Sequence, residues 1–101
     1  MDLVRFRQKP LLGILRGIRS RDLGPLFEAI EASGLEAVEI TMNTEGAPEL
    51  IRNASKHFGR RLMLGAGTIL TMKDLRSALR AGATFIVSPV VIPSVIGYCA
   101  K

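Results

Sequence analysis

One glutamate in an otherwise apolar segment is the first residue of this chain that could do chemistry. Glu39 lies in residues 35–41, LEAVEIT, which are expected to form a strand after a helix that ends at Gly34. In a parallel sheet both faces of such a strand are covered, so the carboxylate would be buried near the strand's carboxyl end. Active sites of βα folds lie at that end. Glu39 is therefore a candidate general acid and base, and a structural ion pair with Arg16 is the alternative.

Other candidate residues also follow expected strands, and each has a purely structural alternative. Arg16 follows the apolar run 11–15 and could bind a carboxylate through two hydrogen bonds, or be a solvated loop arginine. Gly67 and Thr68 end the sequence GAGT. The amides and the hydroxyl of this segment could hold an anion; the alternative is a plain βα turn without a ligand. Pro89 follows the last expected strand and could simply end it.

The sequence indicates neither a cofactor nor a metal. The glycines at 65–67 do not match a dinucleotide-binding fingerprint, because Leu70 occupies the place of its third glycine. They are not followed by the Lys-Ser or Lys-Thr pair of a P-loop. No histidines, cysteines or carboxylates have the spacing of metal ligands.

Composition predicts one small domain, residues 1–101. Hydrophobic residues make up 48% of the chain, which allows a packed core, and no apolar run is long enough to span a membrane. The net charge is +5, but the basic residues are dispersed and no aromatic residue is interleaved with a basic cluster, so nucleic acid is not an expected partner. The single cysteine, Cys99, excludes an internal disulfide and fits a reducing compartment, so we expect a cytoplasmic location.

The candidate residues are positioned by four expected strand–helix units. The strands are expected at 11–15, 36–41, 61–64 and 84–87. Helix starts are expected at Ser20, at Asn43 or Thr44 as a cap, at Thr71 as a cap and at Pro93, and helix ends at Gly34, Gly59 and Gly82. Apolar residues at helical spacing, Leu79 among them, form the buried helix faces.

Alternating units of this kind imply parallel strands with helices outside them. Two architectures satisfy that pattern: an open doubly wound sheet of four strands, or half of an eight-stranded (β/α)8 TIM barrel. The half-barrel is the more economical solution, because four units are half of eight.

Four motifs at the ends of the expected strands carry a family resemblance. They are ILRGI at 14–18, AVEI at 37–40, GAGT at 65–68 and FIVSP at 85–89. In this order they resemble the 2-dehydro-3-deoxy-phosphogluconate, 2-dehydro-3-deoxy-6-phosphogalactonate and 4-hydroxy-2-oxoglutarate aldolases, from about residue 10 onward. The resemblance implies a (β/α)8 barrel, usually assembled as trimers. It also implies a class I reaction without a metal, in which a lysine forms a Schiff base and a 2-keto-3-deoxy acid is reversibly cleaved to pyruvate and an aldehyde.

The resemblance also implies roles for the candidate residues. Glu39 would move protons at the substrate hydroxyl and at the methyl group of pyruvate. Thr68, with nearby amides such as that of Gly67, would hold the keto-acid carboxylate. Arg16 would bind the keto-acid portion, and Pro89 would line the pocket.

The chain departs from the family pattern at two positions in its loops. The phosphogluconate branch usually has an arginine shortly after the second strand, where this chain has Met-Asn-Thr at 42–44. Together with Arg16, this difference places the chain closer to the phosphogalactonate branch. Val90 follows Ser-Pro, where the family often has glycine or asparagine, and so is expected to alter the pocket rim.

The third departure is the Schiff-base lysine, which the family places on the sixth strand of the barrel. None of this chain's lysines is placed to replace it: Lys9, Lys56, Lys73 and Lys101. We therefore expect the N-terminal half of an aldolase barrel, truncated after the fourth unit, inactive alone and prone to associate through its open strand edges. A non-catalytic half-barrel that binds or assembles with another chain is one alternative, and a phosphate-binding open α/β domain is another.

Overall fold

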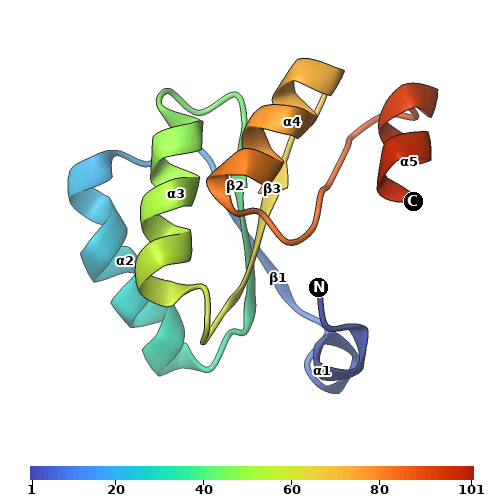
Figure 1. Ribbon diagram of the computed structural model, residues 1–101. Helices are drawn as coiled ribbons and strands as arrows, with labels where there is room; N and C mark the ends of the chain where they lie inside the picture. Colours follow the sequence, from blue (N-terminus) through green and yellow to red (C-terminus); the bar gives the residue numbers. More distant parts are fainter.

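Parallel strands alternate with helices throughout the chain, as the computed structural model of residues 1–101 shows (Figure 1). In chain order the elements are α1 (Leu3–Gln8), β1 (Leu12–Leu15), α2 (Ser20–Ser33), β2 (Ala37–Thr41), α3 (Ala47–Phe58), β3 (Met63–Gly67), α4 (Met72–Ala81) and α5 (Pro93–Cys99). The strands form one parallel sheet in the order β1-β2-β3, which confirms the predicted α/β class. No helix combines the length and the apolar character needed to cross a membrane.

Helices α2, α3 and α4 lie along one face of the sheet, and the main core fills the space between them (Figure 1). Phe27 of α2, Ile51 of α3 and Leu75 of α4 are fully buried together with Val38 and Ile40 of β2. Each helix repeats its apolar residues every three or four positions, which brings them onto one side. Burying a side chain of this size stabilises a fold by about 1.5–3 kcal/mol, so this layer is the main source of stability.

Three helix ends in α2 and α4 follow the predicted local signals. The Thr71 hydroxyl caps α4 by accepting a hydrogen bond from the Asp74 amide at 3.0 Å. Gly34 and Gly82 end α2 and α4 with φ angles of 86° and 114°, a left-handed conformation that glycine adopts without a steric penalty.

Two predictions about the helices are wrong. Helix α3 is not capped by Asn43 or Thr44, because it begins at Ala47 and the Thr44 hydroxyl is bonded to other groups. Leu79, expected in the buried face of α4, is 37% exposed because it lies on the flank that faces a groove beside α5.

The fourth predicted strand, 84–87, is wrong as a full strand. These residues run beside β3, and the Val87 amide donates to the Ala66 carbonyl at 2.9 Å, but ladder pairing is limited to one isolated bridge between Ala66 and Ile86. The far edge of the segment pairs with nothing, and a proline follows it at 89. Because proline has no amide hydrogen, Pro89 cannot donate to a ladder, and pairing stops before it.

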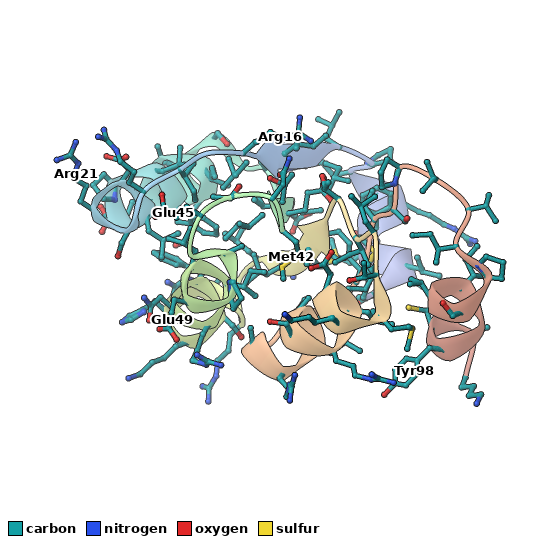
Figure 2. The ribbon with its side chains drawn as sticks, turned by 90° about the horizontal axis from the view of Figure 1, so that it is seen from above. Arg16, Arg21, Met42, Glu45, Glu49 and Tyr98 are labelled. Carbon is teal, nitrogen blue, oxygen red and sulfur yellow. The ribbon has the colours of Figure 1, made fainter.

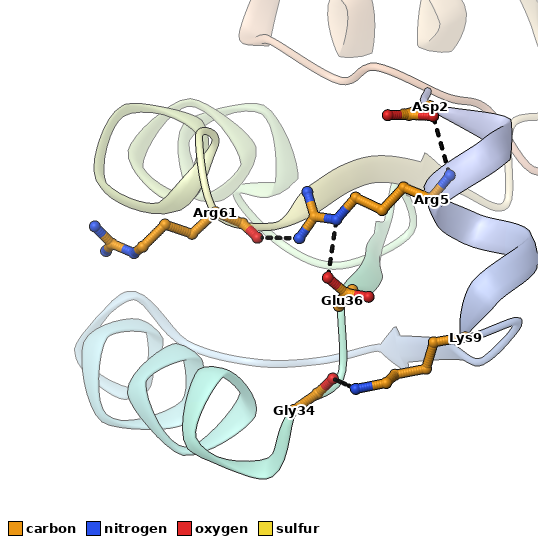
Figure 3. Close-up of polar contacts among 6 residues, drawn as sticks. All are labelled: Asp2, Arg5, Lys9, Gly34, Glu36 and Arg61. Carbon is orange, nitrogen blue, oxygen red and sulfur yellow. Dashed lines mark hydrogen bonds and ion pairs between the residues drawn. The ribbon is translucent and has the colours of Figure 1, made fainter.

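Helix α1 was not expected from the sequence. Asp2 caps it by accepting a hydrogen bond from the Arg5 amide at 3.0 Å. The Arg5 guanidinium donates to the Glu36 carboxylate at 2.9 Å, and the Lys9 ammonium donates to the Gly34 carbonyl at 2.9 Å (Figure 3). These contacts tie α1 to the amino end of β2, which is the end of the sheet opposite the candidate site.

Candidate active site

Glu39 points to the face of the sheet that the helices do not cover. Side chains alternate along β2, so Val38 and Ile40 enter the core below the helices and Glu39 lies on the other side. Glu39 is only 3% exposed, and its Oε2 atom is buried without a hydrogen-bond partner. None of the four ion pairs in the chain includes it, so the alternative of a structural ion pair with Arg16 is not observed.

The surroundings of Glu39 favour its neutral form. Burial raises the pKa of the Glu39 carboxyl above its ordinary value of 4.5, and the positive charge of Arg16 opposes that rise in part. The segments beside β2 add no other charge, because β1, β3 and residues 84–87 contain no ionisable side chain. A carboxyl in this state can both hold and release a proton, which is what general acid–base chemistry requires.

The space for the Glu39 carboxylate comes from a glycine on the neighbouring strand. A Cβ atom at Gly67 would overlap the carboxylate of Glu39, and one at Gly65 would overlap the ring of Phe85. Gly65 is the register partner of Glu39, so both glycines face the same side of the sheet as the glutamate. Strand β3 therefore continues through these glycines, which corrects the predicted strand end at Leu64.

Arg16 and Thr68 lie on either side of β2 and are bonded to each other. Arg16 follows β1, Thr68 follows β3, and the Arg16 Nη2 atom donates to the Thr68 hydroxyl at 3.3 Å. Thr68 has a φ of 53°, a left-handed conformation that is uncommon for a β-branched residue. The structure thus brings Arg16, Glu39, Gly67 and Thr68 to the carboxyl end of the sheet, and Figure 2 shows Arg16 from above that end.

Two threonine hydroxyls at this end do not appear among the predicted site residues. Thr41 and Thr44 are buried, and their hydroxyl oxygens lie 2.8 Å apart. The Thr44 hydroxyl also accepts a hydrogen bond from the Gly17 amide at 3.0 Å. The signal in the sequence was a second threonine three residues after a buried strand, but that residue was interpreted as a helix cap.

Pro89 lies in a different hollow from the other candidates. This hollow, of about 860 Å³, is lined mainly by apolar residues of segment 84–91 and of helix α5, including Tyr98 (Figure 2). Glu39, Arg16 and Thr68 do not line it. The role of Pro89 in a substrate pocket therefore stays a prediction.

All four lysines are exposed: Lys9, Lys56, Lys73 and Lys101. An exposed lysine keeps a protonated amine at neutral pH, which makes it a poor nucleophile for Schiff-base formation. The chain also contains no group of three or more histidine, cysteine or carboxylate residues that could hold a metal ion.

Comparison with curated proteins finds aldolases. Residues 4–101 match the family model for KDPG and KHG aldolase. The 2-dehydro-3-deoxy-phosphogluconate aldolase of Treponema pallidum is 38% identical over 81 residues, which are 80% of this chain and 38% of that protein. A probable 2-dehydro-3-deoxy-6-phosphogalactonate aldolase of Rhizobium meliloti is 32% identical over 93 residues, 92% of this chain and 44% of that protein. The chain thus spans less than half the length of these relatives.

Solved structures give the same result. KDPG aldolase from Legionella pneumophila, with pyruvate captured at low pH as a covalent carbinolamine intermediate, is 27% identical with a TM-score of 0.84 over 91% of this chain and 44% of that one. The Zymomonas mobilis 2-keto-3-deoxy-6-phosphogluconate aldolase with 3-phosphoglycerate is 35% identical with a TM-score of 0.78, over 90% of this chain and 43% of that one. The predicted match to part of an aldolase barrel is therefore confirmed. The chain belongs to the KDPG and KHG aldolase family.

Proposed function

We propose that Glu39 is the acid–base residue of a class I aldolase that reversibly cleaves a 2-keto-3-deoxy acid to pyruvate and an aldehyde. The observation that carries this proposal is the buried Glu39 carboxyl in β2, which has an unpartnered oxygen and a raised pKa. Enzymes use such carboxyls to move protons at neutral pH. Family membership and the pyruvate captured by the Legionella relative support the reaction and substrate class.

Glu39 would act twice in the cleavage direction. As a carboxylate it first takes the proton of the substrate hydroxyl while the adjacent carbon–carbon bond breaks, and the hydroxyl oxygen becomes the carbonyl of the aldehyde. The electron pair of the broken bond passes into the pyruvate portion. Glu39 then returns a proton to the carbon that becomes the methyl group of pyruvate, and the same carboxyl is ready for another cycle.

Arg16 and Thr68 would hold the carboxylate of the keto acid. Two observations support this role: the guanidinium and the hydroxyl are hydrogen-bonded to each other at 3.3 Å, and the charge of Arg16 acts on Glu39. A guanidinium binds a carboxylate with charge-assisted hydrogen bonds, and the amides of Gly67 and Thr68 would add neutral ones. Holding the carboxylate here presents the rest of the keto acid to Glu39.

The Schiff-base lysine would come from a part of the enzyme outside residues 1–101, since the four lysines of this chain are exposed. We therefore propose that residues 1–101 bind the keto acid without turning it over. The substrate would be a 2-keto-3-deoxy-6-phospho sugar acid, with the galactonate series favoured by Arg16 and residues 42–44, or 4-hydroxy-2-oxoglutarate. Assembly as a homotrimer and a cytoplasmic location stay predictions.

The test is a pyruvate titration of the 15N-labelled chain, with acetate as the control for unspecific carboxylate binding. We expect saturable shifts of the Gly67 and Thr68 amides with pyruvate and not with acetate. Borohydride reduction with pyruvate, read by intact mass, should leave the chain unmodified. A covalent adduct on one lysine would overturn the assignment of the Schiff base to another part of the enzyme. A folded chain without pyruvate shifts would overturn keto-acid binding and favour the non-catalytic assembly module.

A further inference from the structure

Thr44 is buried at the site, and its side chain takes no part in capping the helix that follows it, although its carbonyl accepts a hydrogen bond from the Ala47 amide at 3.1 Å. The residue is 5% exposed and precedes α3, whose N-cap is Gly46 and receives no side-chain hydrogen bond. Its hydroxyl is bonded on two sides instead, to the Thr41 hydroxyl at 2.8 Å and to the Gly17 amide at 3.0 Å. Because a hydroxyl has one hydrogen and two acceptor positions, Thr44 can accept from Gly17 and still share a hydrogen bond with Thr41.

The Gly17 amide belongs to the peptide bond that follows Arg16. Gly17 has a φ of 72°, so the chain turns sharply at this point, directly after the residue that carries the guanidinium. A hydrogen bond that holds this amide fixes the orientation of the peptide plane next to Arg16. It therefore also fixes the direction in which the Arg16 side chain leaves the backbone.

Little else holds Arg16 in place. Strand β1 is at the edge of the sheet and pairs only with β2, so its other side offers no support. The guanidinium makes one hydrogen bond within the chain, to the Thr68 hydroxyl at 3.3 Å, and forms no ion pair. Two contacts thus determine where the positive charge sits, one at the tip of the side chain and one at the backbone beside it.

We propose that Thr44 is a positioning residue for the site: its hydroxyl, anchored on Thr41, holds the Gly17 amide and so keeps the Arg16 guanidinium directed across the carboxyl end of the sheet toward Thr68. The threonine pair links the β2–α3 loop to the β1–α2 loop. The same β2–α3 loop is joined to β3, because the Met42 amide donates to the Gly67 carbonyl at 2.8 Å. The two loops and the end of β3 are thereby fixed relative to one another. The positioning role does not depend on the proposed function; only the identity of the ligand that Arg16 would bind rests on it.

Thr44→Val removes the hydroxyl and keeps the shape of the side chain, and Thr44→Ser is the matched control that keeps the hydroxyl. The readout is the pKa of Glu39, followed through its 13C-labelled carboxyl, because Arg16 is the charged group that acts on it. If Thr44 directs Arg16, Thr44→Val should raise the Glu39 pKa in the same direction as Arg16→Gln, and Thr44→Ser should leave it unchanged. In the Arg16→Gln background, Thr44→Val should cause no further rise in the Glu39 pKa. A Glu39 pKa that Thr44→Val leaves unchanged would overturn the proposal, as would an equal further rise in that background.

A second measurement needs no substitution and applies even if Thr44→Val does not fold. Hydrogen exchange of the unmodified chain should show the Gly17 amide protected, although its residue is solvent-exposed. Exchange at the rate of a free loop amide would contradict the bond on which the proposal depends.

Pyruvate separates the positioning role from the proposed function. We expect Thr44→Val to weaken pyruvate binding about fivefold, which corresponds to one neutral hydrogen bond, and Thr44→Ser to restore it. If the pKa effects appear but pyruvate binds neither chain, the positioning role stands and the keto-acid function fails. If pyruvate binds both chains equally and the pKa effects are missing, the function stands and the positioning role fails.

Discussion

Two glutamates three residues apart lie in opposite surroundings: Glu36 directly precedes β2, and Glu39 lies within it. Glu36 precedes the strand, is half-buried and receives a hydrogen bond from the Arg5 guanidinium at 2.9 Å (Figure 3). Glu39 lies near the carboxyl end, is almost fully buried and has an oxygen without any partner. At the amino end of the sheet the charge of Glu36 is thus paired with that of Arg5, and this pairing contributes to stability. The carboxyl end leaves a carboxyl unsatisfied, which lowers stability and leaves an acid–base group free for a substrate.

The amino end repeats this pattern beyond Glu36. Arg61 is joined to Glu31 by an ion pair. The Arg61 carbonyl accepts a hydrogen bond from the Arg5 guanidinium (Figure 3). The Lys9 ammonium donates to the Gly34 carbonyl. These charged side chains are all paired, so they hold this end of the fold together: Arg5, Lys9, Glu31, Glu36 and Arg61.

The largest expected effect tests whether Gly67 exists to make room for Glu39. In Gly67→Ala the new methyl group overlaps the carboxylate, so either the glutamate or the strand must shift. We expect a loss of about 1–3 kcal/mol in the free energy of unfolding, the usual cost of overpacking, measured by urea denaturation. Gly24→Ala is the control: it places a methyl group in open space on α2 and should raise stability by about 0.5–1 kcal/mol.

The cause of that loss can be isolated by a second substitution. If Glu39 is the group that Gly67 accommodates, Gly67→Ala should cost much less in a Glu39→Ala background. An equal cost in both backgrounds would show that Gly67 serves the strand and not the glutamate.

The next effect concerns Arg16. Arg16→Gln removes the charge that holds the Glu39 pKa down, so that pKa should rise further, and pyruvate binding should weaken at least about tenfold through loss of a charge-assisted hydrogen bond. Arg19→Gln is the control, because Arg19 forms an exposed pair with Asp22 on α2. Carboxyl NMR and a pyruvate titration measure both quantities, and equal behaviour of the two variants would remove Arg16 from the site.

Replacing Glu39 and Glu36 by glutamine should change the free energy of unfolding in opposite directions: Glu39→Gln should raise it and Glu36→Gln should lower it. The folded chain binds the Glu39 proton more tightly than the unfolded chain does, because the pKa is raised on folding. The stability that this proton contributes is present below pH 4.5, the ordinary pKa, and is lost as the pH rises through the raised pKa. Glu39→Gln should therefore be more stable than the original chain at pH 7, with the difference disappearing toward pH 4. Thermal unfolding at several pH values measures it, and a destabilised Glu39→Gln at pH 7 would contradict the account.

The smallest effect is expected at the amino end. Glu36→Gln weakens one half-buried ion pair with Arg5, so we expect a loss of about 0.2–1 kcal/mol at pH 7 that becomes smaller at high salt. Urea denaturation at two salt concentrations measures this loss. If Glu36→Gln instead raised stability, as Glu39→Gln is expected to do, the two glutamates would not differ in the way that their surroundings predict.

The parts of the fold that the sequence predicts correctly depend on neighbours along the chain. Helical spacing places Phe27, Ile51 and Leu75 in the core, and the Thr71 cap and the Gly34 end arise within one helical turn. The burial of Glu39 is also predictable, because the apolar residues on either side of it indicate a buried strand.

The predictions that fail depend on contacts between distant parts of the chain. Strand β3 continues through Gly65 and Gly67 because Phe85 and Glu39, each at least 20 residues away, occupy the space above them. The role of Thr44 depends on Gly17, which lies 27 residues before it. Helix α1 is held by groups 25 to 56 residues away. Local patterns contain none of this information, so glycines were interpreted as a turn and a threonine as a cap.

The most direct test of the central claim is a site-resolved titration of Glu39 in the unmodified chain, with Glu39→Gln used to assign the signal. The account predicts a Glu39 pKa above 4.5 in the folded chain, and a change in that pKa when pyruvate is added. A pKa at or below 4.5 would mean that the carboxyl is stabilised in its charged form. In that case Glu39 would be a structural residue like Glu36, and the acid–base role would be wrong.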